Sequence, residues 1–255
     1  MNEVINKKIK KLNGTAGVII KELNGNKEFM YNENIIFPAA SIIKLTIIWD
    51  LFKKIESQEL SLDNEIILKK QDKVGGFGIL KELHNGLSLT IEDLITLMII
   101  MSDNTATNIL INNLGMRSIN NEINRLNLKN TKLQRKMMDI EAKKRGNDNY
   151  TSPIDIYNLL KIFLTTNELN KKNKNKIINI LMKQQCNNKL PKYLTENIDL
   201  AHKTGDLPNV EHDVGVMFIK NKKIIIVVLT KDLENNEKGV EFNNEIGEIV
   251  YKYYK

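Results

Sequence analysis

Strand-like patterns lie at the two ends of this 255-residue chain, and the long stretch between them is patterned for helices. Two strands are predicted near the N-terminus, at 14–21 and 27–31, and three near the C-terminus, at 199–205, 213–220 and 223–230. The last two are joined tightly around Asn221, as in an antiparallel hairpin. We therefore expect the chain ends to meet in one five-stranded antiparallel sheet, with the helical middle inserted as a second lobe.

The helical periodicity predicts where that second lobe lies. A short basic helix in the first dozen residues and a closing helix at 239–253 are expected to flank the sheet. Further helices are predicted at about 41–55, 89–101, 105–113, 116–126, 153–163 and 175–184. The expected fold class is α+β, as a single domain over 1–255. Its α/β lobe would span about 1–40 and 195–255, and its all-helical lobe about 41–194, with functional groups converging at the seam.

Composition and charge exclude several classes of function. The net charge of +7 comes from dispersed lysines with few aromatics, so no nucleic-acid partner is expected. Cys186 is the only cysteine and does not form a metal-ligand pattern with the three histidines, so neither a metal nor another cofactor is predicted.

The same features bear on membranes and location. No apolar run is long enough for a transmembrane segment, and the N-terminus lacks the apolar part of a signal peptide. We expect a monomer that is cytoplasmic, or periplasmic or secreted if an export signal was removed.

A serine and a lysine lie one helical turn apart in an otherwise apolar segment. Ser41 opens the sequence SIIK, and Lys44 is the only charged residue between positions 37 and 49. Positions i and i+3 share a helix face, so the amine is expected near the hydroxyl. A serine nucleophile needs an adjacent base, and a lysine with a lowered pKa can be one. Ser41 and Lys44 are candidate catalytic residues, although Ser41 could also simply cap a helix.

Two further polar motifs follow buried or strand-like segments. Ser102-Asp103-Asn104 interrupts an apolar run, where a second hydroxyl can relay a proton and an amide can hold a carbonyl. A helix end with a capping serine explains this triplet equally well. Lys203-Thr204-Gly205 ends a predicted strand, and its glycine permits close approach of a substrate to the backbone. The backbone N–H groups of Asp206 and Ser41 are candidates for an oxyanion hole.

Together the three motifs resemble those of class A β-lactamases and penicillin-binding proteins. Ser-x-x-Lys, Ser-Asp-Asn and Lys-Thr-Gly occur in that order, and 61 and 101 residues separate their first positions. The likeness covers nearly the whole chain, through FPAASIIKL, MSDNTATNIL, LMKQQCNNKLP and HKTGDLPNVEHDVGV. It implies a β-lactamase/transpeptidase-like fold and a serine hydrolase that acts on the cyclic amide of β-lactams through an acyl-enzyme.

The resemblance also implies a role for each motif residue. Ser41 would attack the β-lactam carbonyl, with Lys44 as base or proton relay, and Ser102 would protonate the leaving nitrogen. Lys203 and Thr204 would meet the substrate carboxylate. Gly205 and Asp206, beside them on the same edge, complete the predicted substrate-binding set. Asn104 would contact the amide of the substrate side chain.

One segment departs from the family pattern. Class A enzymes carry an Ω-loop glutamate that activates water for deacylation. Alignment from Thr131, Leu133 and Arg135 places Met137 at that position, and alignment back from Pro153 places Lys136 there. Neither is an ordinary general base.

The nearest carboxylates are Asp139 and Glu141, of which we prefer Glu141 as a relocated base. Both are also plausible as surface acids of the loop. Asp206 is a second departure, because it puts an acid beside the carboxylate-binding edge.

Three functions are compatible with these motifs. The leading hypothesis is a class A-like β-lactamase, with slow deacylation. The alternative is a penicillin-binding D-Ala-D-Ala carboxypeptidase or transpeptidase that acts on a peptidoglycan peptide and does not need the glutamate. The third is a β-lactam-binding sensor that stays acylated, and a glutaminase is a minor fourth.

Overall fold

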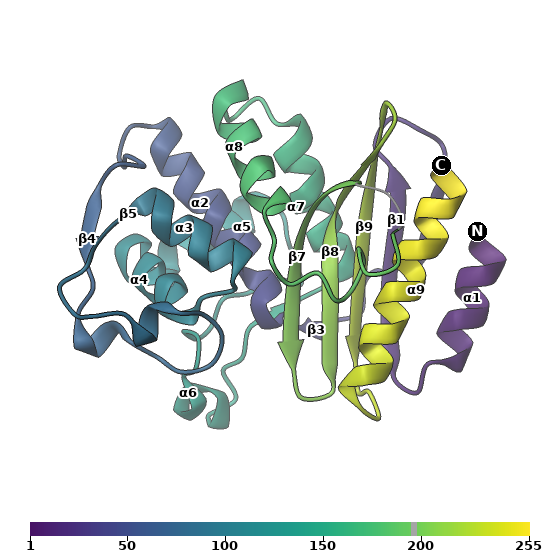
Figure 1. The fold of residues 1–255 in the computed structure, drawn as a ribbon, viewed down its shortest axis with the longest axis horizontal. Helices are drawn as coiled ribbons and strands as arrows, with labels where there is room; N and C mark the ends of the chain where they lie inside the picture. The colour runs from purple at the N-terminus through teal and green to yellow at the C-terminus, as the bar shows by residue number, and fades with distance from the viewer. Residues whose placement is uncertain (195–197) are drawn as a thin grey trace.

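One antiparallel sheet joins the two ends of the chain (Figure 1). The computed structural model describes residues 1–194 and 198–255. In spatial order the sheet contains β2 (Glu28–Tyr31), β1 (Thr15–Glu22), β9 (Lys222–Lys231), β8 (Val210–Ile219) and β7 (Asp199–Leu207). In the central pair, Val18 of β1 lies opposite Val228 of β9. The predicted five-stranded sheet is therefore confirmed, and β7 is one of its edges.

Helices cover both faces of this sheet. Helices α1 (Asn2–Lys11) and α9 (Asn236–Tyr254) lie side by side on one face (Figure 1), over a core that includes Ile5 and Phe242. Helix α7 (Pro153–Thr165) packs against β1 and β9 on the other face. The run Ile224 to Leu229 of β9 is completely buried, which explains why its sequence is continuously apolar and β-branched.

The remaining helices form the second lobe, beside the sheet (Figure 1). They are α2 (Lys44–Glu56), α3 (Ile91–Ile100), α4 (Asn104–Leu114), α5 (Met116–Arg125), α6 (Ile140–Lys144) and α8 (Lys171–Met182). The connections contain the short 3₁₀ helices η1 (Ala40–Ile43), η2 (Lys70–Asp72) and η3 (Leu80–Glu82). They also contain two short antiparallel sheets: β3 (Phe37–Pro38) pairs with β6 (Tyr150–Thr151), and β4 (Glu65–Ile67) pairs with β5 (Ser88–Thr90). A capping box of Thr90 and Asp93 starts α3.

Several predicted boundaries differ from the structure. The helix predicted at 41–55 is divided into η1 and α2. Helix α8 begins four residues earlier than the predicted 175, because the Asn170 side chain caps it by accepting from the Asn173 N–H at 2.9 Å. Strand β8 begins at Val210 rather than 213. The lobe boundary predicted near residue 195 lies outside the described residues.

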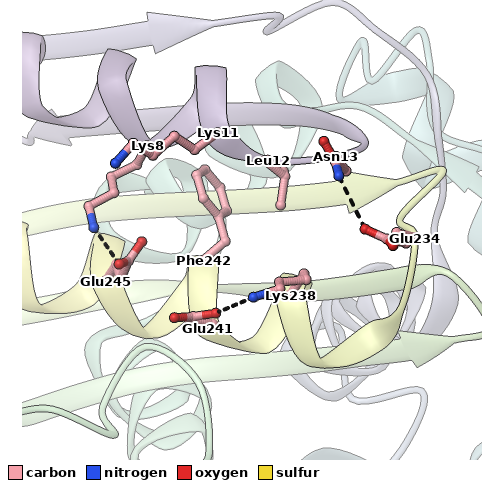
Figure 2. A pocket seen from close by; sticks show the side chains of 9 residues that line it. All are labelled: Lys8, Lys11, Leu12, Asn13, Glu234, Lys238, Glu241, Phe242 and Glu245. Atoms are coloured by element: carbon pink, nitrogen blue, oxygen red, sulfur yellow. Dashed lines mark hydrogen bonds and ion pairs between the residues drawn. The ribbon is translucent and has the colours of Figure 1, made fainter.

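Polar contacts in and just after the C-terminal half of α1 hold this helix against α9 (Figure 2). Lys8 forms an ion pair with Glu245, and the Asn13 amide donates to Glu234 at 3.1 Å. A cavity of about 300 Å³ lies between the two helices, with Phe242 in its wall. Because four of its charged side chains form the ion pairs Lys8–Glu245 and Lys238–Glu241, we read this cavity as a seam between elements and not as a charged binding site.

Candidate active site

Ser41 is presented to a cavity by a strained turn. It is the second residue of η1, and the preceding residue, Ala40, has φ +46°, which is costly for a residue with a side chain. The Lys44 N–H donates to the Ser41 carbonyl, which places the two residues one turn apart as predicted. Ser41 lines a cavity of about 640 Å³, and its hydroxyl forms no hydrogen bond with any described residue. The hydroxyl is therefore free to meet a substrate.

Lys44 is completely buried and faces the second motif. Its ammonium nitrogen lies 2.7 Å from the Ser102 carbonyl, 3.0 Å from the Ser102 hydroxyl and 3.1 Å from Asn104 Oδ1. Burial, together with the nearby positive charge of Lys203, holds the pKa of Lys44 well below its usual value. A lysine whose pKa is lowered in this way loses its proton more readily than an exposed lysine, and in the neutral form it can act as a base.

The Ser102 hydroxyl lies between two lysines that come from different lobes. Ser102 has φ +53° in the link between α3 and α4, and its Oγ is 3.0 Å from Lys44 Nζ and 3.1 Å from Lys203 Nζ. Lys203, on β7, is also completely buried, and burial lowers its pKa to about 8. The structure thus brings Lys44, Ser102 and Lys203 into one hydrogen-bonded chain, one turn from Ser41.

The edge strand β7 closes the site beside Ser41. A Cβ atom added to Gly205 would lie 3.2 Å from the Ser41 backbone nitrogen, so a side chain there would crowd the nucleophile. The Thr204 hydroxyl is buried and has no hydrogen-bond partner among the described residues, and Thr204 does not line the cavity. Asp206 lines the cavity, but its carboxylate forms an ion pair with the buried Lys189.

Asp103 and Asn104 hold the wall opposite β7. The Asp103 carboxylate caps α4 by accepting from the Ala106 N–H at 2.9 Å, and it also accepts from the N–H of Ile79 at 2.7 Å. Asn104 lines the cavity, and its amide nitrogen donates to the Gly75 carbonyl at 3.2 Å. The second motif therefore both supplies polar groups and fixes the loop before α3.

Met137 lies in the cavity wall, held there by an asparagine. The Asn108 side chain accepts from the Met137 N–H at 2.8 Å and donates to the Met137 carbonyl at 3.0 Å. An ion pair of Arg135 with Asp148, at 2.8 Å, closes the base of this loop. The sequence alignment that placed Met137, rather than Lys136, toward the site therefore agrees with the cavity lining.

Glu141 is not brought together with Ser41. It lies on α6 with 69% of its side chain exposed, pairs with Lys144 at 2.9 Å and does not line the cavity. The helical turn of α6 directs it to solvent, which its closeness in sequence could not show. Asp139 does line the cavity, but one of its oxygens caps α6 by accepting from the Ala142 N–H at 2.9 Å. The geometry gives no support to Glu141 as the base.

Two residues of the site were missed in the sequence. Asn108 sits four residues after Asn104 on the same helix face, a spacing that could have linked it to the site. No sequence pattern identifies Lys189, because it lies in the connection between α8 and β7, and its position depends on how that connection packs against the sheet. Neither residue belongs to a recognised motif.

Across residues 1–194 and 198–255, no cluster of three metal-ligating side chains is found. Over the same residues, no helix has the length and apolar character required to cross a bilayer.

A free serine hydroxyl, two buried lysines and a bridging serine, at the seam of an α+β fold, define an active-site serine hydrolase that works through acyl transfer. The chain belongs to the β-lactamase enzyme family, whose model matches residues 1–254. This confirms the predicted family and, with it, the class of enzyme.

Known proteins support the assignment over nearly the full length. β-Lactamase VEB-1 of Pseudomonas aeruginosa is 26% identical, over 96% of this chain and 87% of its own. A β-lactamase structure from Sphaerobacter thermophilus is 29% identical, with a TM-score of 0.88, over 97% of this chain and 94% of that one. The structure of PBP-A is 25% identical, with a TM-score of 0.90, over 99% and 95%. A mutant of PBP-A, with a TM-score of 0.89, is an acyl-enzyme complex with penicillin G.

Proposed function

We propose that the protein hydrolyses β-lactams through an acyl-enzyme on Ser41, and that deacylation is its slow step. One observation carries this proposal. The residues expected to perform acylation lie together, whereas a methionine occupies the position in the cavity wall where deacylation would need a general base. Ser41, Lys44, Ser102 and Lys203 are all in place, whereas Met137 has no proton chemistry.

Acylation follows from the contacts of the two lysines. Neutral Lys44 takes the proton from Ser41 as its oxygen attacks the lactam carbonyl, and the oxyanion is stabilised by backbone N–H groups of Ser41 and Asp206. The proton then passes from Lys44 to the Ser102 hydroxyl, 3.0 Å away, which protonates the departing nitrogen. Lys203, 3.1 Å from the same hydroxyl, supplies positive charge for the substrate carboxylate.

For deacylation, no comparable base is found among the described residues that line the cavity. Hydrolysis of the ester needs a base to take a proton from water, and removal of such a base costs about 10²–10⁴-fold in rate. The side chain of Met137 fills this part of the wall and is mostly buried. Among the described residues that line the cavity, only Asp139 and Asp206 carry carboxylates, and both are engaged elsewhere.

A second candidate is an enzyme that transfers or hydrolyses D-Ala-D-Ala peptide ends. The same methionine favours it, because acyl transfer to an amine does not use the missing carboxylate. The likeness to PBP-A is equally compatible with this candidate.

Intact-mass spectrometry with penicillin G tests the proposal. The parent protein is mixed with excess penicillin, and the adduct is followed until the antibiotic is exhausted. We expect one stoichiometric adduct that forms quickly and clears slowly, with a burst followed by a slow steady rate of hydrolysis. Ser41→Ala is the control and should form no adduct, because it removes the nucleophile but changes little in volume.

The other outcomes are equally informative. An adduct that never clears would contradict hydrolysis and favour the peptide-processing candidate. Absence of any adduct in the parent would contradict both candidates.

A further inference from the structure

A buried cluster of charges lies directly behind the cavity edge of β7. The ammonium of Lys189 forms ion pairs with Asp206 and, at 2.6 Å, with Glu211, and it donates to the His212 carbonyl at 3.2 Å. Lys189 is completely buried, and burial alone would lower its pKa. The attraction of Asp206 and Glu211 outweighs burial and raises that pKa, so the lysine stays charged.

Asp206 belongs both to this cluster and to the active site. It follows Lys203, Thr204 and Gly205 on the strand, lines the cavity and leaves 28% of its side chain exposed. Burial opposes its ionisation, but the Lys189 ammonium prevails and lowers the pKa of Asp206. The cavity wall beside the nucleophile therefore contains an ionised carboxylate.

Such a charge would oppose the proposed reaction if nothing compensated it. Penicillins are anions, and the tetrahedral intermediate carries a further negative charge near Ser41. A carboxylate in the adjoining wall repels both, most strongly where water is excluded. The ion pair with the buried Lys189 engages one oxygen of the Asp206 carboxylate and supplies the opposite charge.

We propose that Lys189 is a positioning residue, which draws the Asp206 carboxylate out of the acylation site and so permits an anionic substrate. The inference rests on the proposed function, because it concerns the same cavity and the same substrate class. Glu211, opposite Asp206 in the β7–β8 register, completes the arrangement, and its carboxyl accepts from the Asn236 amide at 2.6 Å. Burial raises the pKa of Glu211 to about 7, so that Asp206 is the stronger acid of the pair.

A purely structural role is the rival explanation. The contacts of Lys189 with the His212 carbonyl and, at 3.5 Å, with the Gly205 carbonyl also hold β7 and β8 together. Loss of that support would slow acylation by every substrate alike. An electrostatic role instead discriminates between charged and neutral substrates, and this difference decides between the two.

The experiment measures acylation rates with penicillin G and with its neutral methyl ester. The variants are Lys189→Met, Asp206→Asn and the double variant, and Lys192→Met, at an exposed lysine nearby, is the matched control. We expect Lys189→Met to lower the ratio of anionic to neutral rates by about 10-fold or more. Asp206→Asn should raise the ratio, and the double variant should return it to near the parent value.

Each outcome has a definite meaning. Equal losses for both substrates in Lys189→Met, with no recovery in the double variant, would overturn the inference. If Lys189→Met does not fold, an unchanged ratio in Asp206→Asn would overturn it. A parent that forms no adduct with penicillin G would contradict the proposed function itself, and the inference with it. A parent that is acylated while its variants keep the same ratio would contradict the inference alone.

Discussion

Two lysines bind one hydroxyl in this site, and burial lowers the pKa of both. The pKa of Lys44 lies well below its usual value, because the side chain is buried and also faces the positive charge of Lys203. Lys203 has a pKa of about 8 and remains charged at neutral pH. One residue therefore accepts the proton of Ser41 while the other keeps a positive charge for the substrate.

This difference predicts a pH profile for acylation. As pH rises through about 8, Lys203 loses its charge, so the acylation rate for an anionic β-lactam should fall. Stopped-flow acylation rates from pH 6 to pH 10 would show this limb. In Lys203→Arg the limb should disappear, because arginine stays charged over the whole range.

The control for this profile is Lys223→Arg, which changes an exposed lysine of β9. It should reproduce the parent profile. A limb that persists unchanged in Lys203→Arg would show that another group titrates there.

The motif residues could be assigned from sequence because their chemistry is local to short patterns. Ser41 and Lys44 are one turn apart on any helix, and the contact of Lys44 with Ser102 follows from the motif order once the fold is known. Lys189 could not be assigned, because a lysine before a leucine looks the same whether it is solvated or buried. Glu141 was assigned to the site by closeness in sequence, and α6 directs it to solvent.

Residue 137, in the loop before α6, is held by one side chain of α4. Asn108 of α4 holds both backbone polar groups of Met137, and this fixes where residue 137 meets the cavity. A carboxylate introduced at 137 should therefore act as a base only while this support is present.

A double-variant comparison tests that dependence. Met137→Glu should speed clearance of the penicillin adduct by about 10²-fold or more, since it supplies the missing base. In the Asn108→Ala background the gain should be largely lost, and the loss of two buried hydrogen bonds should lower stability by about 1–3 kcal/mol. Clearance is followed by intact mass, with Asn121→Ala, at an exposed asparagine of α5, as the control.

The prediction fails if the gain from Met137→Glu is the same in both backgrounds. It also fails if the glutamate variant clears the adduct no faster than the parent.

Most helices and strands could be predicted from the sequence, because the spacing of apolar residues indicates which face of each element is buried. The five strands and the terminal helices were all found. The start of α8 was missed because its first two turns, from Lys171, are lysine- and asparagine-rich and bury little. Short elements such as β3 and β6 carry too few residues for any periodicity.

For the molecule as a whole, a buried histidine ties the sheet to the start of the active-site turn. His212 on β8 donates from Nε2 to the Pro38 carbonyl at 2.8 Å and accepts at Nδ1 from the Thr230 N–H at 3.1 Å. The second contact requires the neutral ring, because a protonated Nδ1 cannot accept a hydrogen bond. Burial lowers the pKa of His212 from 6.5 to about 4.

This predicts a loss of stability in mild acid. Between pH 6.5 and 4 the unfolded chain binds a proton on this ring that the folded protein does not, so the contribution of His212 falls as pH falls. From pH 7 to pH 5 the loss is about 2 kcal/mol. Glu211, with a raised pKa of about 7, acts in the opposite direction over this window. The difference between the parent and His212→Gln therefore isolates the histidine.

Urea unfolding at pH 7 and pH 5 measures this difference. The free energy of unfolding should decrease more in the parent than in His212→Gln, by about 2 kcal/mol. His84→Gln, at an exposed histidine, should behave as the parent. Equal changes in the parent and His212→Gln would refute the assignment.

The sheet that joins the chain ends also sets an order of events during synthesis. Val18 pairs with Val228, about 200 residues later, and a ribosome adding about 5–20 residues per second needs roughly 10–40 s to cover that span. Throughout this interval β1 has only the short β2 as a neighbour and leaves an apolar edge without its main partner. The inserted helices are translated well before that edge is covered. In a newly made chain, the apolar edge of β1 therefore stays without its main partner until β9 has been translated.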